Sequence, residues 1–244
     1  MIDLSPGSYE YLLAFADDEH LIGARHTSWI GVAPFLEEDL AFCSIAQDEL
    51  GHAISLYELL TDDVDRFALC RESHEYRSCW LVEMPCRSWD EALVRHVLYD
   101  LAETIRWQSL GAIVGAIAGR ALREEAFHIS HATHMLGRML NAGGDVSDRV
   151  IAATDRLLPI AAALWEPTAG ETEALADGLA TRASTESAEL WWTTVATLYA
   201  QHSVSLRRPI PQPGQDGRRT RSQHFADLHS EITKVIDLDR TATW

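Results

Sequence analysis

Two short segments of the sequence repeat the pattern Glu-x-x-His. One is Glu-Leu-Gly-His, with Glu49 and His52, and the other is Glu-Ala-Phe-His, with Glu125 and His128. In a helix, residues three apart lie on the same face, so each segment aims one carboxylate and one imidazole at the same point. Two such turns on facing helices, with one further carboxylate from each of two other helices, form the di-metal site of ferritin-like bundles. The pattern therefore predicts a carboxylate-rich site for two metal ions.

The two missing carboxylates are expected on the helices that precede the two motifs. Glu19 stands 30 residues before the first motif glutamate, and a break at residues 29–34 divides that interval into two legs. At about 1.5 Å of rise per residue the two legs roughly match, so both glutamates can lie at similar heights. The other carboxylate is Asp100 or Glu103, which lie about one turn apart on one helical face. Spacing alone does not separate these two.

The donor set indicates which metal and which chemistry to expect. Oxygen and nitrogen donors without thiolate suit iron or manganese, and open coordination positions suit the activation of dioxygen. Exposed Glu and His are common in helices, but apolar neighbours such as Ile45, Leu50 and Leu122 place the motifs in buried surroundings. A buried unpaired carboxylate is costly, and a bound metal removes that cost. We therefore expect two iron ions, with manganese as the alternative, and dioxygen as co-substrate.

The cysteines do not support a structural zinc site. None of the four forms a C-x-x-C pair, and their spacing does not suit zinc. The simplest interpretation is that the cysteines are reduced thiols, with the first of them buried in a helix. The four are Cys43, Cys70, Cys79 and Cys86.

The elements that must position these residues are helices nearly throughout. Apolar periodicity predicts an all-α, ferritin-like four-helix bundle within about residues 8–140, with additional C-terminal helices within about 146–240. We expect residues 1–244 to form a single domain. Ser88 followed by Glu91 is a capping-box signature, and Asn141 to Gly144 is a helix stop. Helices are expected over residues 8–28, 35–60, 89–110, 116–140, 146–165, 171–201 and 222–238.

Charge and hydropathy exclude several classes of function. The net charge is −17 and Lys234 is the single lysine, so nucleic acid is a poor partner. Part of the negative charge is expected inside, on carboxylates that bind metal. No membrane span and no secretory signal are recognised, so the protein is expected in the cytoplasm. The cluster of Arg218, Arg219 and Arg221 is expected to be a solvated tail.

At the motifs, the chain resembles the phenylacetyl-CoA epoxidase (phenylacetic acid catabolic) family. Residues 45–52 look like the Gln-Asp-Glu-x-Gly-His segment of its catalytic subunit, and residues 123–128 resemble that subunit's second Glu-Glu-x-x-His. Trp89 and Asp100 match the family's third-helix tryptophan and aspartate ligand, so the resemblance favours Asp100 over Glu103. It implies that two irons are bound by Glu19, Glu49, His52, Asp100, Glu125 and His128.

Other parts of the chain resemble a different member of the same system. Residues 82–85 and 217–244 look like the smaller structural subunit, which has lost the metal ligands, whereas this chain keeps them. The resemblance implies a diiron monooxygenase that inserts oxygen, by epoxidation or hydroxylation, into a small organic substrate, to be sought among aromatic or acyl-CoA compounds. It also implies an electron-donor reductase, and a paralogous subunit or a second copy of the chain as partner.

Other functions compete with this one. The chain can instead be a non-catalytic structural subunit of an epoxidase-like complex, or a stand-alone biosynthetic diiron oxidase or N-oxygenase. An iron-storage role is less favoured, because a long C-terminal part of the chain lies beyond the bundle.

Overall fold

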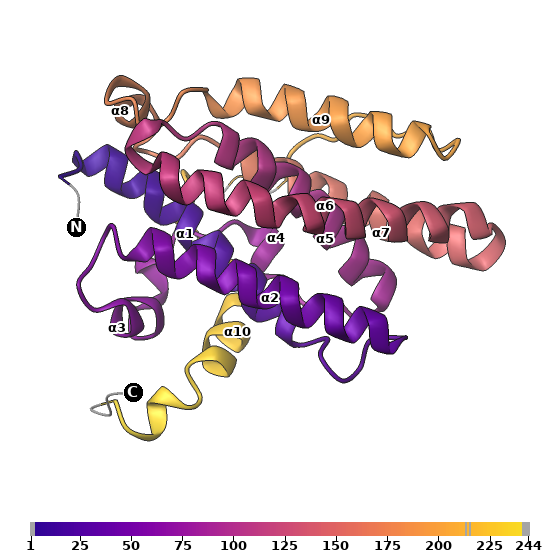
Figure 1. Cartoon of the computed structure of the whole chain (residues 1–244), viewed down its shortest axis with the longest axis horizontal. Coiled ribbons are helices and arrows are strands. Elements are labelled where there is room, and N and C mark those ends of the chain that lie inside the picture. The colour runs from indigo at the N-terminus through magenta and orange to yellow at the C-terminus, as the bar shows by residue number, and fades with distance from the viewer. Residues whose placement is uncertain (1–2, 213, 215, 241–244) are drawn as a thin grey trace.

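Four long helices form the bundle that the sequence predicts. The computed structural model describes residues 3–212, 214 and 216–240, and within these residues helices are the only extended regular elements. The first long helix packs against the second, and the third packs against the fourth. The second helix also packs on the fourth, which joins the two pairs. The all-α, ferritin-like prediction is confirmed (Figure 1). The four helices are α1 (Pro6–Thr27), α2 (Leu36–Tyr57), α5 (Trp89–Gln108) and α6 (Gly115–Ala142).

The connections give the bundle two antiparallel pairs and one long crossover. A short turn joins α1 to α2, and the short η2 (Ala112–Val114) lies between α5 and α6. The connection from α2 to α5 is longer and crosses the bundle, as in ferritin-like topologies. It carries α3 (Val64–Leu69), η1 (Ser73–Glu75) and α4 (Trp80–Glu83).

The helix ends follow the local signals. The Ser88 hydroxyl accepts a hydrogen bond from the Glu91 backbone N–H at 3.4 Å, which caps α5 as predicted. The Glu91 carboxylate accepts from the backbone N–H of Arg87 at 2.7 Å. Helix α6 ends before Gly143, whose φ of 68° is a left-handed conformation that glycine adopts without strain. The predicted stop at this point is confirmed.

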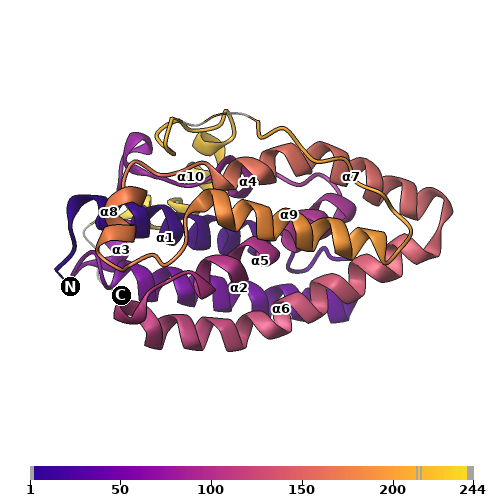
Figure 2. The ribbon, with the colours of Figure 1, turned by 90° about the horizontal axis from the view of Figure 1, so that it is seen from above.

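Two of the C-terminal helices cover the bundle on the side of α5. Helix α7 packs on α5 and α6, and α9 packs on α5 (Figure 2). None of the helices in the described part of the chain is both long and apolar enough to cross a membrane. The remaining elements are α7 (Gly144–Ala162), η3 (Ala163–Trp165), α8 (Glu171–Ala176), α9 (Ser184–Ala200), α10 (Phe225–Ile232) and η4 (Ile236–Leu238).

The expectation of one helix over residues 171–201 is wrong. The chain leaves the helical path at Gly178, where φ is +73°, and it resumes at α9. Between the two helices, the carbonyl of Leu179 accepts a hydrogen bond from the backbone N–H of Gly111 at 2.8 Å. A Cβ at Gly111 would lie 1.8 Å from the Gly178 carbonyl oxygen, so this approach requires a glycine. Tertiary pairing therefore overrides local helix propensity.

The C-terminal segment also departs from expectation. The helix predicted over residues 222–238 is shorter, because α10 ends at Ile232 and only η4 follows. Arg218 and Arg221 are not a solvated tail. The Arg218 side chain retains 3% exposure and lies 2.6 Å from the Asp18 carboxylate, and Arg221 lies 2.5 Å from the Glu83 carboxylate. Ion pairing to buried carboxylates draws this segment into the bundle, which the sequence alone does not indicate.

The core consists of two clusters of buried apolar side chains. The larger extends between α5, α6, α7 and α9 and includes Tyr99. The smaller lies around α1, α2 and the end of α5, and it includes Trp107. Both of these aromatic side chains donate hydrogen bonds to buried glutamates, Tyr99 to Glu19 and Trp107 to Glu103. The polar site described next therefore lies where the two clusters meet.

Candidate metal centre

The two Glu-x-x-His turns face each other across the contact between α2 and α6. Nδ1 of His52 lies 3.8 Å from Glu49 of its own turn, and Nδ1 of His128 lies 2.8 Å from Glu125 of its own turn. The carboxylate of Glu49 also approaches Nδ1 of His128 at 3.7 Å. Glu49 therefore lies between the two histidines, with one carboxylate oxygen toward each.

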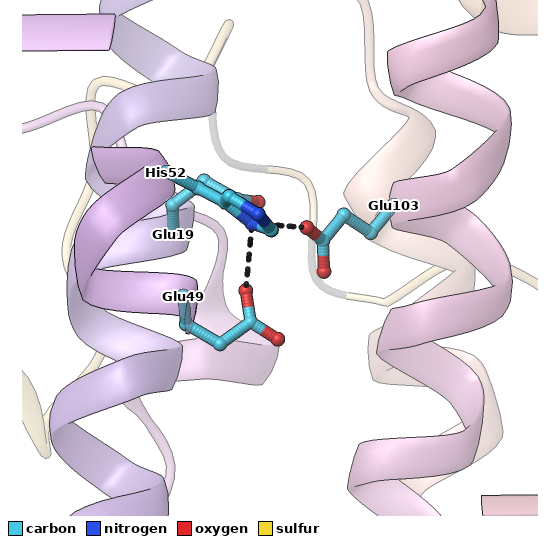
Figure 3. A group of neighbouring side chains, drawn as sticks. All are labelled: Glu19, Glu49, His52 and Glu103. Atoms are coloured by element: carbon cyan, nitrogen blue, oxygen red, sulfur yellow. Dashed lines mark hydrogen bonds and ion pairs between the residues drawn. The ribbon is translucent and has the colours of Figure 1, made fainter. Parts of the chain in front are cut away.

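Carboxylates from α1 and α5 complete one side of the site. Nδ1 of His52 lies 3.3 Å from Oε2 of Glu19 and 3.2 Å from Oε1 of Glu103. Figure 3 shows Glu103 reaching toward His52 from the helix that lies across from the one carrying Glu49 and His52. Two overlapping groups with the spacing of metal ligands result, and Glu49 belongs to both. They are Glu19, Glu49, His52 and Glu103, and Glu49, Glu125 and His128.

The alternative ligand on α5 lies outside these groups. Asp100 is fully buried, and its Oδ2 lies 2.9 Å from Nδ1 of His96, four residues earlier on the same helix. The resemblance favours Asp100, whereas the structure brings Glu103 to the grouped carboxylates. Of the predicted residues, the structure thus gathers Glu19, Glu49, His52, Glu103, Glu125 and His128.

Burial makes this concentration of carboxylates costly unless positive charge compensates it. Each grouped residue is at most 3% exposed. Both oxygens of Glu49 and of Glu125 have no hydrogen-bond partner, and neither do Oε2 of Glu103 and Nδ1 of His128. These unpartnered atoms are the donors that a cation would take. The donor set of carboxylate oxygens and imidazole nitrogens fits two iron or manganese ions.

The pKa values reflect the same cost of burying several carboxylates close together. Burial raises the pKa of Glu19 and of Glu49 well above the ordinary value, and the nearby Glu103 carboxylate raises both further. Burial likewise raises the pKa of Glu125, again with Glu103 as the next contributor. Glu103 itself is the exception: against the effect of burial, hydrogen bonds with His52 and Glu19 lower its pKa to about 2. One ionised carboxylate thus disfavours ionisation of the others.

The outer nitrogens of the two histidines are held by a crossed pair of acids. Nε2 of His52 on α2 lies 2.9 Å from Glu124 on α6, and Nε2 of His128 on α6 lies 3.3 Å from Asp48 on α2. Such partners fix the orientation of a ligand imidazole and direct its other nitrogen inward. The sequence gives a signal for both, because each acid directly precedes a motif glutamate, but it does not show that each serves the opposite helix.

Two aromatic donors were not anticipated from the sequence. The Tyr99 hydroxyl donates to Oε1 of Glu19 at 2.6 Å, and Nε1 of Trp107 donates to Oε1 of Glu103 at 2.8 Å. Each lies four residues from Glu103 on α5, which places all three on adjacent positions of one helical face. That spacing is the signal that could have found them.

Fold and site together define the class: a ferritin-like helical protein with a buried carboxylate–histidine centre. Comparison with known proteins gives the family. The sequence profile of the family described as "Phenylacetic acid catabolic protein" matches residues 4–244, and the chain belongs to that family. It is also 29% identical over 146 residues to the C subunit of the 1,2-phenylacetyl-CoA epoxidase of Escherichia coli (strain K12). That match covers 56% of this chain and 58% of the relative, so it spans less than two thirds of the relative's length. The family resemblance noted in the sequence is confirmed.

Proposed function

We propose that this chain is the oxygen-activating subunit of a diiron monooxygenase. The observation that carries the proposal is the pair of overlapping ligand groups that share Glu49, in which buried carboxylate oxygens lack partners. A carboxylate shared by two groups is the arrangement that bridges two ions. The proposed ligands are Glu19, Glu49, His52, Glu103, Glu125 and His128, with Asp100 as the alternative to Glu103.

The reaction class follows from this donor set and from the family. Two bound irons would supply the redox chemistry that reduces dioxygen. One oxygen atom enters the substrate and the other leaves as water, which takes two electrons and two protons in each turnover. A separate reductase would provide the electrons. The substrate class to test first is the CoA thioester of an aromatic acid, because the relative is named for phenylacetyl-CoA.

The chain's own residues contribute binding, orientation and the exclusion of water. Asp48 and Glu124 hold the outer nitrogens of the histidines, so that both Nδ1 atoms face the carboxylates. Tyr99 and Trp107 fix one oxygen each of Glu19 and Glu103. The burial of the whole group keeps bulk water from the place where oxygen is reduced.

One observation favours a second function. The relative is named as the C subunit of its epoxidase, and the sequence of residues 82–85 and of the C-terminal segment resembles a structural subunit. In that case the chain supports a paralogous oxygenase and its carboxylates have no redox role. A stand-alone oxidase or N-oxygenase is the third candidate, and turnover without a partner subunit would mark it.

Metal content and the response to oxygen distinguish these functions. The protein is loaded with ferrous iron without oxygen, its iron is counted, and its absorption is followed after oxygen is added. We expect about two irons per chain and a transient absorption that is lost in Glu49→Ala and His128→Ala. Glu58→Ala, an exposed glutamate just after α2, is the matched control and should behave as wild type. Wild-type protein without stoichiometric iron would refute the proposal, and capture of a paralogous oxygenase would then support the structural role.

A further inference from the structure

A small cavity lies between the bundle and the C-terminal segments, and none of the proposed metal ligands lines it. Its walls come from α1, α5, η3 and the loop after it, the start of α9 and the arginine-rich C-terminal segment. The cavity has a volume of about 20 Å³, roughly the room that one water molecule or one monatomic ion needs. The lining residues that decide its chemistry are Arg106, Trp165, Glu166, Thr168, Arg182 and Arg218.

Positive charge exceeds negative charge around this cavity. Arg106, Arg182 and Arg218 contribute three guanidinium groups, and Glu166 is the acidic residue among the described lining side chains. One further carboxylate, Asp18, accepts hydrogen bonds from Arg106 at 2.7 Å and from Arg218 at 2.6 Å, although it does not itself line the cavity. Arginine stays protonated in proteins. Three positive charges therefore face two negative ones, and one positive charge is left without a counter-charge.

The uncompensated charge is that of Arg182, which precedes α9. Its Nη1 donates to the neutral Ser109 hydroxyl at 3.1 Å, and it forms no ion pair with the carboxylates in the described part of the chain. The hydroxyl of Ser109 can accept this bond because it donates its own proton to the carbonyl of Ile105. Glu171 lies nearby, but its carboxylate accepts from the backbone N–H and the hydroxyl of Ser184. The half-buried guanidinium thus lacks an anionic partner.

Buried donors without a partner belong to the same wall. Nε of Arg218 and Nε1 of Trp165 have no hydrogen-bond partner, and neither does Oγ1 of Thr168. Arg218 is 2% exposed and Trp165 is 7% exposed, so bulk water does not satisfy these two N–H groups. Both groups can only donate, and a buried donor that has no acceptor destabilises the folded state. The wall of the cavity therefore calls for an acceptor that the described side chains do not supply.

We propose that this cavity is a binding site for a chloride ion. A monatomic anion fits the volume, balances the remaining positive charge and accepts hydrogen bonds from several directions at once. A water molecule also fits the volume, but it carries no charge and must donate its own two hydrogens, for which this wall offers mainly donors. Polyatomic anions such as sulfate need more room. The proposal is independent of the oxygen-activating function above.

A chloride ion at this place joins segments that lie far apart in the sequence. Arg106 belongs to α5 of the bundle, Trp165 to η3, and Arg182 to the loop before α9. Arg218 adds the C-terminal segment, which already reaches Asp18 on α1. The complete set of donors exists only when these segments are assembled, so the ion binds the folded chain and not the unfolded one. Chloride therefore stabilises the folded state by mass action.

Thermal unfolding in two salts tests this stabilisation without iron or substrate. The Tm of the full chain is measured in sodium chloride and in sodium gluconate at the same ionic strength, because gluconate is too large for the cavity. With a Kd of about 1 mM, 100 mM chloride should raise the Tm by roughly 5–10 °C over gluconate. Equal Tm values in the two salts would refute the proposal.

Two variants assign the chloride effect to this cavity. Trp165→Phe removes one donor and keeps an aromatic ring, and Arg182→Gln removes the uncompensated charge; each should reduce the chloride-dependent rise in Tm by at least half. Trp191→Phe is the matched control, because the buried Nε1 of Trp191 donates to the carbonyl of Leu98 at 3.0 Å and not to the cavity. This control should lower the Tm in both salts and keep the full rise. A full rise in both cavity variants would contradict the assignment.

Crystals of the wild-type protein grown with bromide in place of chloride locate the ion directly, even if the variants fold poorly. Bromide has a strong anomalous X-ray signal, so it is distinguished from water. We expect an anomalous peak in the cavity, in hydrogen-bond contact with Nε of Arg218 and Nε1 of Trp165. A cavity that holds water without an anomalous peak would overturn the proposal, and so would bromide bound at exposed arginines alone.

Discussion

Removal of the Arg218 guanidinium tests how the C-terminal segment is attached to the bundle. Nη1 of Arg218 donates to the fully buried Asp18 carboxylate at 2.6 Å, and Nη2 donates to the carbonyl of Leu164. In Arg218→Ala, Asp18 keeps Arg106, at 2.7 Å, and the backbone N–H of Cys79, at 2.6 Å. The loss is therefore at the lower end of the cost of breaking a buried ion pair, about 3 kcal/mol.

Reversible unfolding in urea measures this loss directly. A destabilisation of about 3 kcal/mol corresponds to a decrease in Tm of roughly 6–12 °C for a chain of this size. Arg219→Ala is the control, because Arg219 is the adjacent residue and is exposed. We expect that control to stay within about 0.5 kcal/mol of wild type. A loss below about 1 kcal/mol in Arg218→Ala, or an equal loss in the control, would refute the claim that the Arg218–Asp18 ion pair anchors the C-terminal segment.

Two further predictions concern the histidine supports and a buried thiol. Asp48→Asn and Glu124→Gln should each weaken ferrous binding by about 10- to 100-fold in a metal titration, because the ligand imidazoles lose their orienting acids; unchanged affinity in both would exclude this role. Burial raises the pKa of Cys79 from 9.0 to about 12. Between these values the thiol ionises in the unfolded chain but not in the folded one, so the folded state loses stability as pH rises, by about 1.4 kcal/mol per pH unit. Urea unfolding at alkaline pH should show this slope in wild type and a smaller one in Cys79→Ala, and equal slopes would contradict it.

Much of the bundle is readable from the sequence because its signals are local. Capping at Ser88, the stop at Gly143 and the spacing of the two Glu-x-x-His turns depend on neighbouring residues alone. The division of residues 171–201 into two helices depends instead on contact between Gly111 and Gly178, far apart in the chain. The burial of Arg218 likewise depends on Asp18, 200 residues away. Such long-range contacts produce no periodic pattern in the sequence from which they could be predicted. The single-domain organisation stays a prediction.

The candidate site divides in the same way. One motif, present once on α2 and once on α6, predicts Glu49, His52, Glu125 and His128, because in each copy the two residues share one helical face. The choice on α5 does not, because two carboxylates about one turn apart share a face and differ only in height along the bundle. The packing of α5 against its neighbouring helices sets that height, and it brings Glu103 to His52 at 3.2 Å. Only tertiary structure can supply that information.

The buried carboxylates of α1 show why the centre calls for metal. Asp17, Asp18 and Glu19 follow one another and all are fully buried. Asp17 pairs with Arg71, and Asp18 pairs with Arg106 and Arg218, so these charges are neutralised by the chain itself. Glu19 has no ion pair with an arginine among the described contacts. Its neighbours are the Tyr99 hydroxyl, which donates to it, further carboxylates and a histidine.

The contrast between carboxylates that pair with arginine and carboxylates that do not also applies to the whole site, and it determines the net charge of the site. The grouped glutamates are four, on four different helices, and together they carry four negative charges when ionised. Two divalent ions carry four positive charges, so binding them leaves the buried group neutral, the state that a low-dielectric interior favours. An ionised Asp100 would add a fifth negative charge that nothing on α5 balances, and burial indeed raises its pKa well above the ordinary value. Charge balance therefore supports Glu103 as the ligand.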